Sequence, residues 1–533
     1  MTKPLAALAI TGVVLVMGLT DFERAGVAAR PIPVEAPVEA APQDPTGPPQ
    51  LPRVTVDTGA PATTGRTIHV PAGGNLQTAI DEATPGDRIT LQPGATYEGP
   101  FRLRPKTGDG WIVITTSATD LPKPGQRVGP ADARRMPRIT GAAEALIEAD
   151  AGAHHYRLVG LEVTPTEGAA VTNLIQLGDD AKSGDLVPHH IIIDRCYLHG
   201  DPQRGSRRGV ALNAAHAAVI DSYLVDFKQP TVDAQAISGW NGPGPFRIAG
   251  NYLEASGENI MFGGADPDIP NLVPSDIEIV RNHLTKPLRW KRDDPSYEGT
   301  EWAVKNLFEL KNARRVLVEG NLIEHNWPQA QNGFAILFTV RNQDGGAPWS
   351  VVEDVTFTNN YVRRVAAGIN ILGRDDNHPS QQTRRIAIVN NVFEDVGGAW
   401  GGNGRLFQLL DRTSAITIER NTATHTGGII FAGDTGPHES FVFQGNLMPH
   451  NEYGIIGSGT GPGNSTLQKF FPGGIVRGNV LIGAPAASYP NDNLYPASRE
   501  SAGPAANGRG PGADVAALDS ALGGLATVRR SER

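Results

Sequence analysis

The stretch RVLVEGNLI at residues 315–323 decides the fold, because an alternating apolar strand runs into an Asn and then into a second apolar pair. The same pattern returns as VTFTNNYV at 355–362 and IAIVNNVF at 386–393. The spacings of the recurring Asn are 31, 39, 39, 31, 30, 25 and 33 residues, and its positions are Asn251, Asn282, Asn321, Asn360, Asn391, Asn421, Asn446 and Asn479. A shortest spacing near one solenoid coil, lengthened elsewhere by inserted loops, predicts stacked repeats that pack on their neighbours. In the earlier coils Arg195 and Ser222 are assigned to the same place.

A second class of apolar strand lies between these segments, for example KNLFELKN at 305–312, GFAILFTV at 333–340 and AGINILG at 367–373. Hairpin dipeptides such as Asn-Gly do not punctuate the runs, which argues against a sandwich of antiparallel strands. The sequence therefore predicts an all-β fold, a right-handed parallel β-helix. The Asn has a structural role in this interpretation: it tolerates a left-handed backbone, and its amide can bond to the equivalent amide one coil away.

The two ends of the repeat predict the domain boundaries. GGNLQTAIDEA at 73–83 reads as a short amphipathic helix that caps the open N-terminal edge, where unpaired strand groups would invite aggregation. The helix is followed by the turn PGD at 85–87 and a strand at 88–91. We expect the β-helix to span 66–485. The tail at 486–533, with a helix over Ala513–Leu522, is expected to pack along or cap the C-terminal end.

The N-terminal region reads as an export signal. Leu5–Leu19 is apolar apart from Thr11, which is the length of a signal-peptide core and short for a membrane span. We expect residues 1–29 to be a signal peptide or an uncleaved N-terminal anchor, the latter being the expected route to a membrane. Residues 30–65 are rich in Pro and Ala and predict a disordered, extended tether. The protein is thus expected to be exported to an extracellular, periplasmic or cell-surface location.

Composition excludes several classes of protein. The 63 Gly and 42 Pro residues suit many turns between short strands, and the net charge of −9 argues against a nucleic-acid binder. The single cysteine, Cys196, excludes an intramolecular disulfide framework and a Cys-based zinc site. We interpret it as an inert core thiol.

The helix cap, the PGD turn and the Asn-marked coils resemble the pectate-lyase-like superfamily of right-handed β-helix proteins. The stretches QAISGWNGPGPF at 235–246, ENIMFGGADP at 258–267 and VKNLFELKNARRVLVEGN at 304–321 resemble uncharacterised exported bacterial members of that type. The superfamily holds lyases, glycosidases, esterases, epimerases and phage tailspikes, so the resemblance implies a fold and leaves the reaction open.

Candidate site residues lie on the outer faces of the strands. Alternation puts Phe308 and Leu310 inward and therefore Glu309 and Lys311 outward; it likewise puts Phe334, Ile336 and Phe338 inward. Arg341 and Arg374 are also predicted outward, so that Lys311, Arg341 and Arg374 could form a basic column across stacked coils that suits an anionic polysaccharide. The alternative is that these are solvated or salt-bridged face residues.

A Lys on one coil with an Arg on the next resembles the alginate lyase and chondroitinase B family. The resemblance implies that Lys311 is the base and Arg341 the acid of a β-elimination. We further predict substrate contacts from Glu309, Arg374, Trp240 and Asn370. That family's calcium cluster is not found at corresponding positions. Calcium ligands could come from Asp233, Glu258 and Asp266, or from the loop pair Asp375-Asp376, because a hard cation prefers carboxylate oxygens.

Two further features stay open. The pairs His154-His155 and His189-His190 begin strands in adjacent coils and predict either a metal site or a strand-edge ladder. Tryptophans in inserted loops could stack on sugars or could simply pack the loops down.

Two functions remain as hypotheses: a polysaccharide lyase acting on an acidic glycan, and a non-catalytic glycan-binding or structural cell-surface protein. A deep groove in which Glu309, Lys311, Arg341 and Glu258 converge would favour the enzyme, whereas a flat face with paired charges would favour the binder. The oligomeric state is left undetermined.

Overall fold

The computed structural model describes residues 44, 46–433, 435–502 and 510–527. The chain divides into two units, residues 1–33 and 34–533, and all described residues belong to the second. The predicted signal peptide or anchor at 1–29 lies outside the described residues, as does most of 30–45. Across the described ranges, no helix has the length and apolar character that a membrane span requires.

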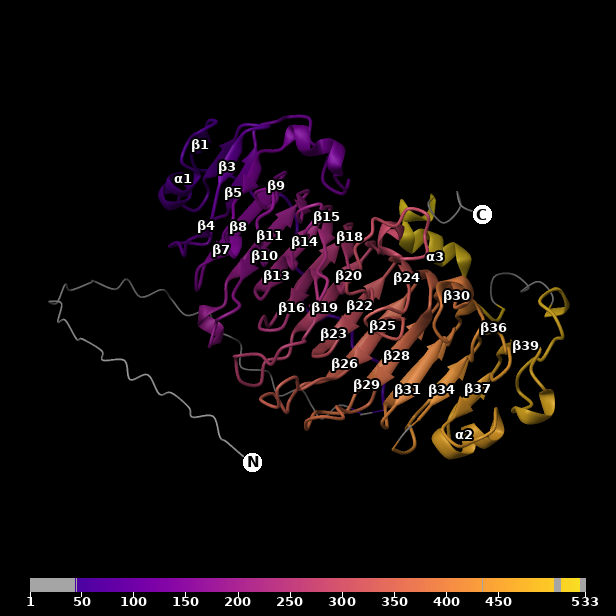
Figure 1. The fold of residues 1–533 in the computed structure, drawn as a ribbon. Coiled ribbons are helices and arrows are strands. Elements are labelled where there is room, and N and C mark those ends of the chain that lie inside the picture. Colours follow the sequence, from indigo (N-terminus) through magenta and orange to yellow (C-terminus); the bar gives the residue numbers. More distant parts are fainter. Residues whose placement is uncertain (1–43, 45, 434, 503–509, 528–533) are drawn as a thin grey trace, which may run out of the picture. The chain divides into compact units, whose positions relative to one another are not determined.

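The described strands form three long parallel sheets, A, B and C, of 14, 13 and 12 strands. The chain visits the sheets in the order A, B, C, and each strand pairs with its equivalent one coil away, as β23 pairs with both β20 and β26. Figure 1 shows these equivalent strands side by side along the coil stack. The prediction of an all-β right-handed parallel β-helix is confirmed.

Sheet A contains β1 (Thr67–Val70), β2 (Arg88–Leu91), β5 (Ile112–Thr116), β8 (His154–Val159), β11 (His189–Asp194), β14 (Ala215–Ile220), β17 (Phe246–Ala249), β20 (Ser275–Val280), β23 (Ala313–Glu319), β26 (Val352–Thr358), β29 (Arg384–Val389), β32 (Ser414–Glu419), β35 (Val442–Gln444) and β38 (Ile475–Arg477). Sheet B contains β3 (Thr96–Glu98), β6 (Arg138–Thr140), β9 (Glu162–Val163), β12 (Tyr197–His199), β15 (Tyr223–Phe227), β18 (Tyr252–Ala255), β21 (His283–Thr285), β24 (Leu322–Asn326), β27 (Tyr361–Val365), β30 (Val392–Val396), β33 (Thr422–His425), β36 (Leu447–Pro449) and β39 (Val480–Ile482). Sheet C contains β4 (Phe101–Leu103), β7 (Ala145–Ala149), β10 (Asn173–Leu177), β13 (Arg208–Leu212), β16 (Gln235–Gly239), β19 (Glu258–Phe262), β22 (Phe308–Leu310), β25 (Phe334–Thr339), β28 (Ala367–Leu372), β31 (Phe407–Leu410), β34 (Ile430–Ala432) and β37 (Ile455–Gly457).

One apolar core runs through the coils, from Val70 to Tyr489. Phe308, Leu310, Ile336 and Phe338 point into it as alternation predicts. Phe334 was predicted inward and is not part of this core: it packs with Leu337 and Ala367 in a separate cluster. The alternation breaks at the start of β25, where Ala335 takes the inward place.

The recurring Asn residues form a buried hydrogen-bond ladder at the turn from sheet A to sheet B. The backbone N–H of Asn321 donates to Oδ1 of Asn360 at 3.0 Å, and the N–H of Asn360 donates to Oδ1 of Asn391 at 2.8 Å. Each side-chain amide also donates to the next Oδ1, as Asn360 Nδ2 does to Asn391 at 3.1 Å. Asn493 in the C-terminal tail extends the ladder, since it accepts from the N–H of Asn479.

The left-handed residue of this turn is not the ladder Asn, contrary to the prediction, but the residue before it. Gly320, Asn359 and Asn390 have φ values of 66°, 55° and 56°. The ladder Asn is thereby free to turn its side chain inward along the stack. Left-handed backbone is easiest for Gly and Asn, which precede most of the ladder Asn residues. Arg281 and Arg420 are the exceptions, with φ values of 54° and 53°.

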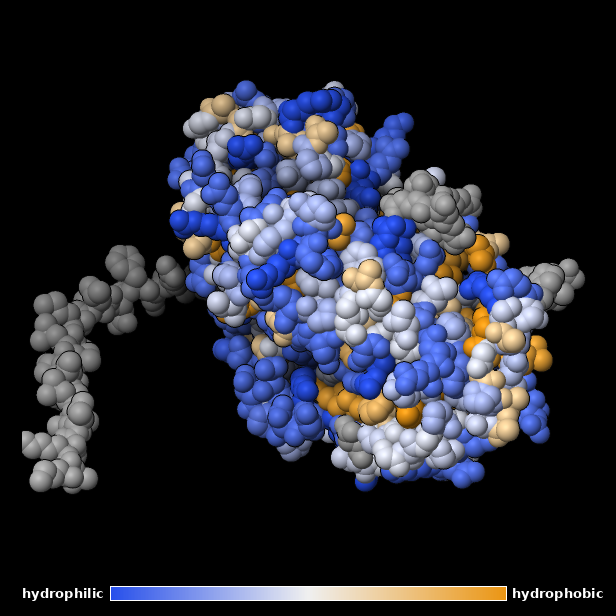
Figure 2. All heavy atoms as spheres, turned by 45° about the vertical axis from the view of Figure 1, so that its right-hand side comes forward, coloured by the Kyte–Doolittle hydropathy of each residue, from blue (hydrophilic) through white to orange (hydrophobic). Residues whose placement is uncertain are grey.

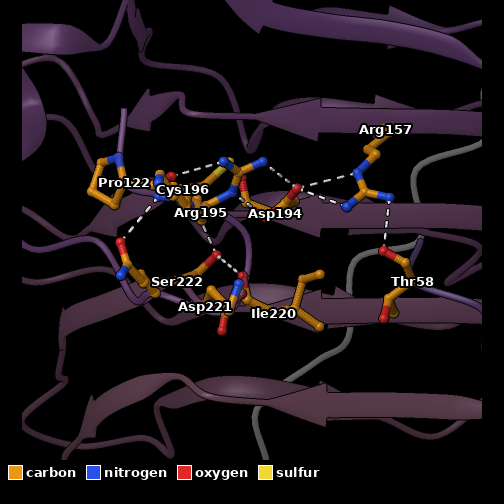
Figure 3. A network of polar contacts seen from close by, with 12 residues as sticks. Thr58, Pro122, Arg157, Asp194, Arg195, Cys196, Ile220, Asp221 and Ser222 are labelled. Carbon is orange, nitrogen blue, oxygen red and sulfur yellow. Dashed lines mark hydrogen bonds and ion pairs between the residues drawn. The ribbon is translucent and has the colours of Figure 1, made fainter. Parts of the chain in front are cut away.

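The ladder place in the earlier coils belongs to Cys196 and Ser222, not to Arg195. Figure 3 shows the pair: the N–H of Cys196 donates to Oγ of Ser222 at 3.0 Å, and Arg195 carries the left-handed φ of 48°. Burial raises the pKa of the Cys196 thiol to about 12, which agrees with an inert core thiol.

Two helices close the ends of the core. Helix α1 (Leu76–Glu82) packs against β1 and β4, and its N-cap Asn75 accepts from the N–H of Thr78. Near the other end, α2 (Asn464–Phe470) packs against β37, and Phe470 enters the core.

The C-terminal tail lies along the side of the coil stack. Its helix α3 (Val515–Leu522) buries Leu518 and Leu522 against Leu322, Tyr361 and Val392 of sheet B. Figure 1 shows α3 beside β24. The helix therefore covers the flank of three coils rather than the terminal edge.

The described part of the predicted tether is not a free spacer. Val56 packs with apolar residues on the outer face of sheet A, such as Ile220. Arg157 Nη1 donates to the carbonyls of Thr58 and Gly59 at 3.1 and 2.6 Å, and Figure 3 shows the bond to Thr58. A Pro-rich strap without a core of its own is therefore held by the outer face of the coils.

Candidate functional site

The candidate site lies on the outer face of sheet C. Parallel pairing aligns Glu309 of β22 with Leu337 of β25, which aligns with Asn370 of β28. Figure 2 shows a molecular face covered mostly by hydrophilic residues, with apolar residues in smaller areas.

A groove of about 400 Å³ on this face brings together four of the residues predicted for catalysis or substrate binding, Glu309, Lys311, Arg341 and Asn370. The loop pair Asp375 and Asp376, which the sequence offers as a calcium site, lines the same groove. Its lining is mainly polar, and its four carboxylates outnumber its two cations. The full lining consists of Glu309, Lys311, Gln331, Leu337, Thr339, Arg341, Gln343, Asn370, Leu372, Asp375, Asp376, Asn377, Leu410 and Asp411.

Glu309 is held rigidly and Lys311 is held loosely. Glu309 is only 2% exposed and accepts from Asn306 Nδ2 at 2.9 Å and Thr339 Oγ1 at 3.4 Å. The Lys311 ammonium lies 3.7 Å from Glu309 Oε1, beyond a good hydrogen bond, and its side chain is 17% exposed. Lys311 can therefore turn toward a molecule in the groove while Glu309 stays in place.

Arg341 is paired firmly with acidic residues. Its Nη1 lies 2.6 Å from Asp375 Oδ1 and also contacts Asp376. The N–H of Asn342 donates to the other oxygen of Asp375. Burial lowers the pKa of Arg341, but Asp376 and Asp375 outweigh it and hold that pKa above its ordinary value. A guanidinium held in this way suits orientation of an anionic group better than proton donation.

A second polar group lies deeper, around Glu258. Glu258 is fully buried, accepts from Gln235 Nε2 at 2.8 Å, and lies 3.9 Å from the Lys305 ammonium. Burial, then the nearby charges of Glu309 and Asp233, raise its pKa to about 7. Glu258 does not line the groove, so the predicted convergence of Glu258 with the other three residues is incomplete.

The predicted calcium ligands Asp233, Glu258 and Asp266 do not form one group, whereas the alternative pair, Asp375 and Asp376, converges on Arg341 in the groove. Asp233 pairs with Lys305 at 2.5 Å, whereas Asp266 accepts from the N–H groups of Asp344 and Gly346 and ties two loops together. Among the described residues, the group of three side chains close enough to share an ion consists of His155, His189 and His190. Asp233 and Asp266 thus have separate partners, and calcium binding stays a prediction.

The remaining predicted residues lie outside the groove lining. Arg374 is exposed, and Trp240 lies under the guanidinium of Arg208, 5.1 Å from its ring centre. Lys311 and Arg341 lie beside each other on adjacent coils, since the backbone N–H of Arg341 donates to the carbonyl of Lys311 at 2.9 Å, whereas Arg374 does not line the groove. The three-cation column is thus reduced to two cations at the groove.

The loop tryptophans Trp290, Trp302 and Trp327 pack together with Val304 and are 2–6% exposed. They hold down their loops rather than offering faces to a sugar.

Sequence reasoning did not identify Thr339, Gln331, Asp411 and Lys305. Thr339 could have been found, because it is the next outward residue after Leu337 in β25. Gln331, Asp411 and Lys305 lie in loops, and their positions depend on loop conformation.

No family model matches the chain, and no curated protein matches it. Among solved structures, the chain is similar to a mannuronic acid specific polysaccharide family 6 lyase from human gut microbiota, with 12% identity and a TM-score of 0.51 over 88% of this chain and 100% of that one. It is also similar to the catalytic unit of a GH87 α-1,3-glucanase from Streptomyces thermodiastaticus strain HF3-3, with 12% identity and a TM-score of 0.51 over 84% and 72%.

At this identity the likeness shows the fold alone. The chain has a right-handed parallel β-helix fold, which a lyase and a glucanase share.

Proposed function

We propose that the protein is an exported polysaccharide lyase that binds an acidic glycan across the outer face of sheet C. The observation that carries the proposal is the polar groove in which the loosely held Lys311 lies beside the rigid Glu309 and the paired Arg341.

The groove chemistry supports one uronate unit near Lys311. In its amine form, Lys311 would remove the C5 proton of that unit. The electron pair then forms the C4–C5 double bond as the C4–O bond breaks, and the leaving oxygen takes a proton from water. Arg341 would orient the uronate carboxylate, because its pairing with Asp375 keeps it charged.

Carboxylates in the groove limit the substrate. The four carboxylates in the lining would repel a polymer with closely spaced negative charges, except beside Lys311 and Arg341. We therefore expect preference for a chain in which charged and neutral sugars alternate.

A second candidate is a non-catalytic glycan-binding protein. The pairing of Arg341 with both Asp375 and Asp376 favours it, because paired charges are typical of a stable binding face.

The test is incubation of the full chain with alginate, pectate, chondroitin and heparan-type polymers, and with a neutral glucan as a control. Ultraviolet absorbance of unsaturated uronate ends reports β-elimination. We expect product from at least one acidic polymer and a rate drop of at least about a hundredfold in Lys311→Ala, the size typical of losing a general base. Arg374→Ala removes an exposed cation outside the groove and should keep the activity.

If no product forms but the chain binds glycan saturably, and Lys311→Ala weakens that binding, the protein is a glycan-binding protein and not a lyase. Neither product nor binding would reject both candidates for this groove.

A further inference from the structure

A cluster of histidines lies at the turn from sheet C to sheet A, apart from the groove. His154 and His155 begin β8, and His189 and His190 begin β11 one coil away. The rings of His154 and His189 stack with centres 4.8 Å apart, and those of His155 and His190 stack at 4.4 Å. His216 continues the second stack, 4.5 Å from His190.

Left-handed backbone brings neighbouring histidines to the same side. Successive side chains of a regular strand point to opposite faces. His155 and His190 have φ values of 57° and 54°, which breaks that alternation. As a result, Nδ1 of His154 lies 2.9 Å from Nδ1 of His155, and Nδ1 of His189 lies 2.7 Å from Nδ1 of His190.

The resulting nitrogens are close enough to share one ion. One ring nitrogen from each of His155, His189 and His190 lies within 4.8 Å of the others, and all three side chains are partly exposed. Two tetrahedral ligand nitrogens at about 2.0–2.1 Å from zinc lie a little over 3 Å apart, so each Nδ1 pair would open by about half an ångström.

His154 carries a typical supporting contact of a metal ligand. Its Nε2 lies 2.9 Å from the carbonyl oxygen of Lys106. A carbonyl only accepts, so Nε2 bears the proton and Nδ1 of the neutral ring presents a lone pair. A ligating histidine commonly donates its other ring N–H to a backbone carbonyl in this way.

We propose that His155, His189 and His190, with Nδ1 of His154 beside them, bind a divalent transition-metal ion of the Zn²⁺, Ni²⁺ or Cu²⁺ class, which joins two adjacent coils. Imidazole nitrogen suits these ions and not Ca²⁺ or Mg²⁺, which prefer oxygen.

Trp111 provides a reporter beside the site. Its ring meets His155 edge-on at 5.2 Å and His190 at 6.4 Å. A bound paramagnetic Cu²⁺ or Ni²⁺ ion should quench its fluorescence, and diamagnetic Zn²⁺ should compete for the same place.

The experiment uses the full chain without a histidine tag, stripped of metal with a chelator. Cu²⁺ and Ni²⁺ are titrated while tryptophan fluorescence is followed, and Zn²⁺ and Ca²⁺ are titrated by calorimetry. We expect saturable quenching with one ion per chain, competition by Zn²⁺ and no heat from Ca²⁺. Trp111→Phe should remove most of the quenching and leave the calorimetric binding intact.

The test variant is the double change His155→Asn and His190→Asn, since Asn tolerates the left-handed backbone of both positions. We expect at least a tenfold loss of affinity. The control is His69→Asn, which removes an exposed histidine of β1. Equal affinity in the test variant and the native chain, or quenching without saturation, would overturn the proposal.

If the double variant fails to fold, two other measurements test the proposal. One is the metal affinity of His189→Gln, and the other is the superhyperfine pattern in the electron paramagnetic resonance spectrum of Cu²⁺ bound to the native chain. Coupling to several imidazole nitrogens supports the site. Coupling to fewer than two nitrogens rejects it.

Discussion

Replacement of Asn360 by Ala should destabilise the middle coils strongly. Asn360 is fully buried, and its Oδ1 accepts two hydrogen bonds from Asn321: one from the backbone N–H at 3.0 Å and one from the side-chain Nδ2 at 2.9 Å. Its Nδ2 donates to the carbonyls of Val318 and Thr358 at 3.0 and 2.9 Å.

The cost follows from the groups left without partners. The N–H of Asn321 would be orphaned, which costs about 1–3 kcal/mol for a buried donor. The two carbonyls would each lose a bond, whereas Nδ2 of Asn321 keeps its bond to Ile279. Allowing for partial relaxation, we expect Asn360→Ala to lower the free energy of unfolding by about 3 kcal/mol.

Urea unfolding followed by circular dichroism measures the loss, and amide hydrogen exchange places it along the coils. The loss of protection should be centred on the turns at Asn321 and Asn391, because coils couple mainly to neighbours. The matched control is Asn370→Ala, which removes a half-buried amide of the groove and should cost less than about 0.5 kcal/mol. A change within about 0.5 kcal/mol for Asn360→Ala would refute the assigned role of the ladder.

Two further predictions concern buried charge and pH. Lys286→Met should lower the free energy of unfolding by about 3 kcal/mol, because the fully buried Nζ donates to the carbonyls of Ala255, Ser256 and Gly257 at 2.7–3.0 Å. Lys182→Met, a surface control, should cost under about 1 kcal/mol. Equal unfolding midpoints for the two variants would contradict this prediction. Burial lowers the pKa of His438 from 6.5 to about 4, and its Nδ1 accepts from Thr413, so the unfolded chain binds a proton that the folded chain refuses as pH falls from 6.5 toward 4. The contribution of this ring to the free energy of unfolding is complete above pH 6.5 and falls by about 3 kcal/mol toward pH 4. His438→Asn keeps an acceptor that cannot be protonated, so it should flatten the dependence of stability on pH measured by thermal melts. An unchanged slope would contradict the assignment.

Much of the fold was predictable because it repeats. The Asn spacing indicates the coils, and alternation assigns Phe308 and Leu310 to the core, since both depend on local geometry that every coil repeats. The offset at Arg195 and Cys196 was missed because a single coil without Asn gives no internal marker of register. The inward assignment of Phe334 failed for a related reason, since one irregular residue at the start of β25 shifts the alternation.

The candidate site was predicted only in part. Glu309, Lys311 and Arg341 were placed on the outer face by strand periodicity, Asn370 was named as a substrate contact, and all four line one groove. The sequence could not show that Arg374 and Trp240 lie outside this groove, because whether an outward side chain lines a groove depends on the loops around it.

The sequence by itself determined the coil, the sheets and the outward direction of the groove residues, because a strand of period two and a repeated Asn turn carry that information locally. Only the tertiary structure decided which charges meet. Arg341 is paired by a loop carboxylate from the next coil, Asp375, and the calcium candidates Asp233 and Asp266 are taken by separate partners. It also decided that His154 and His155 face the same side, because a left-handed residue reverses a side chain in a way that residue identity alone does not specify.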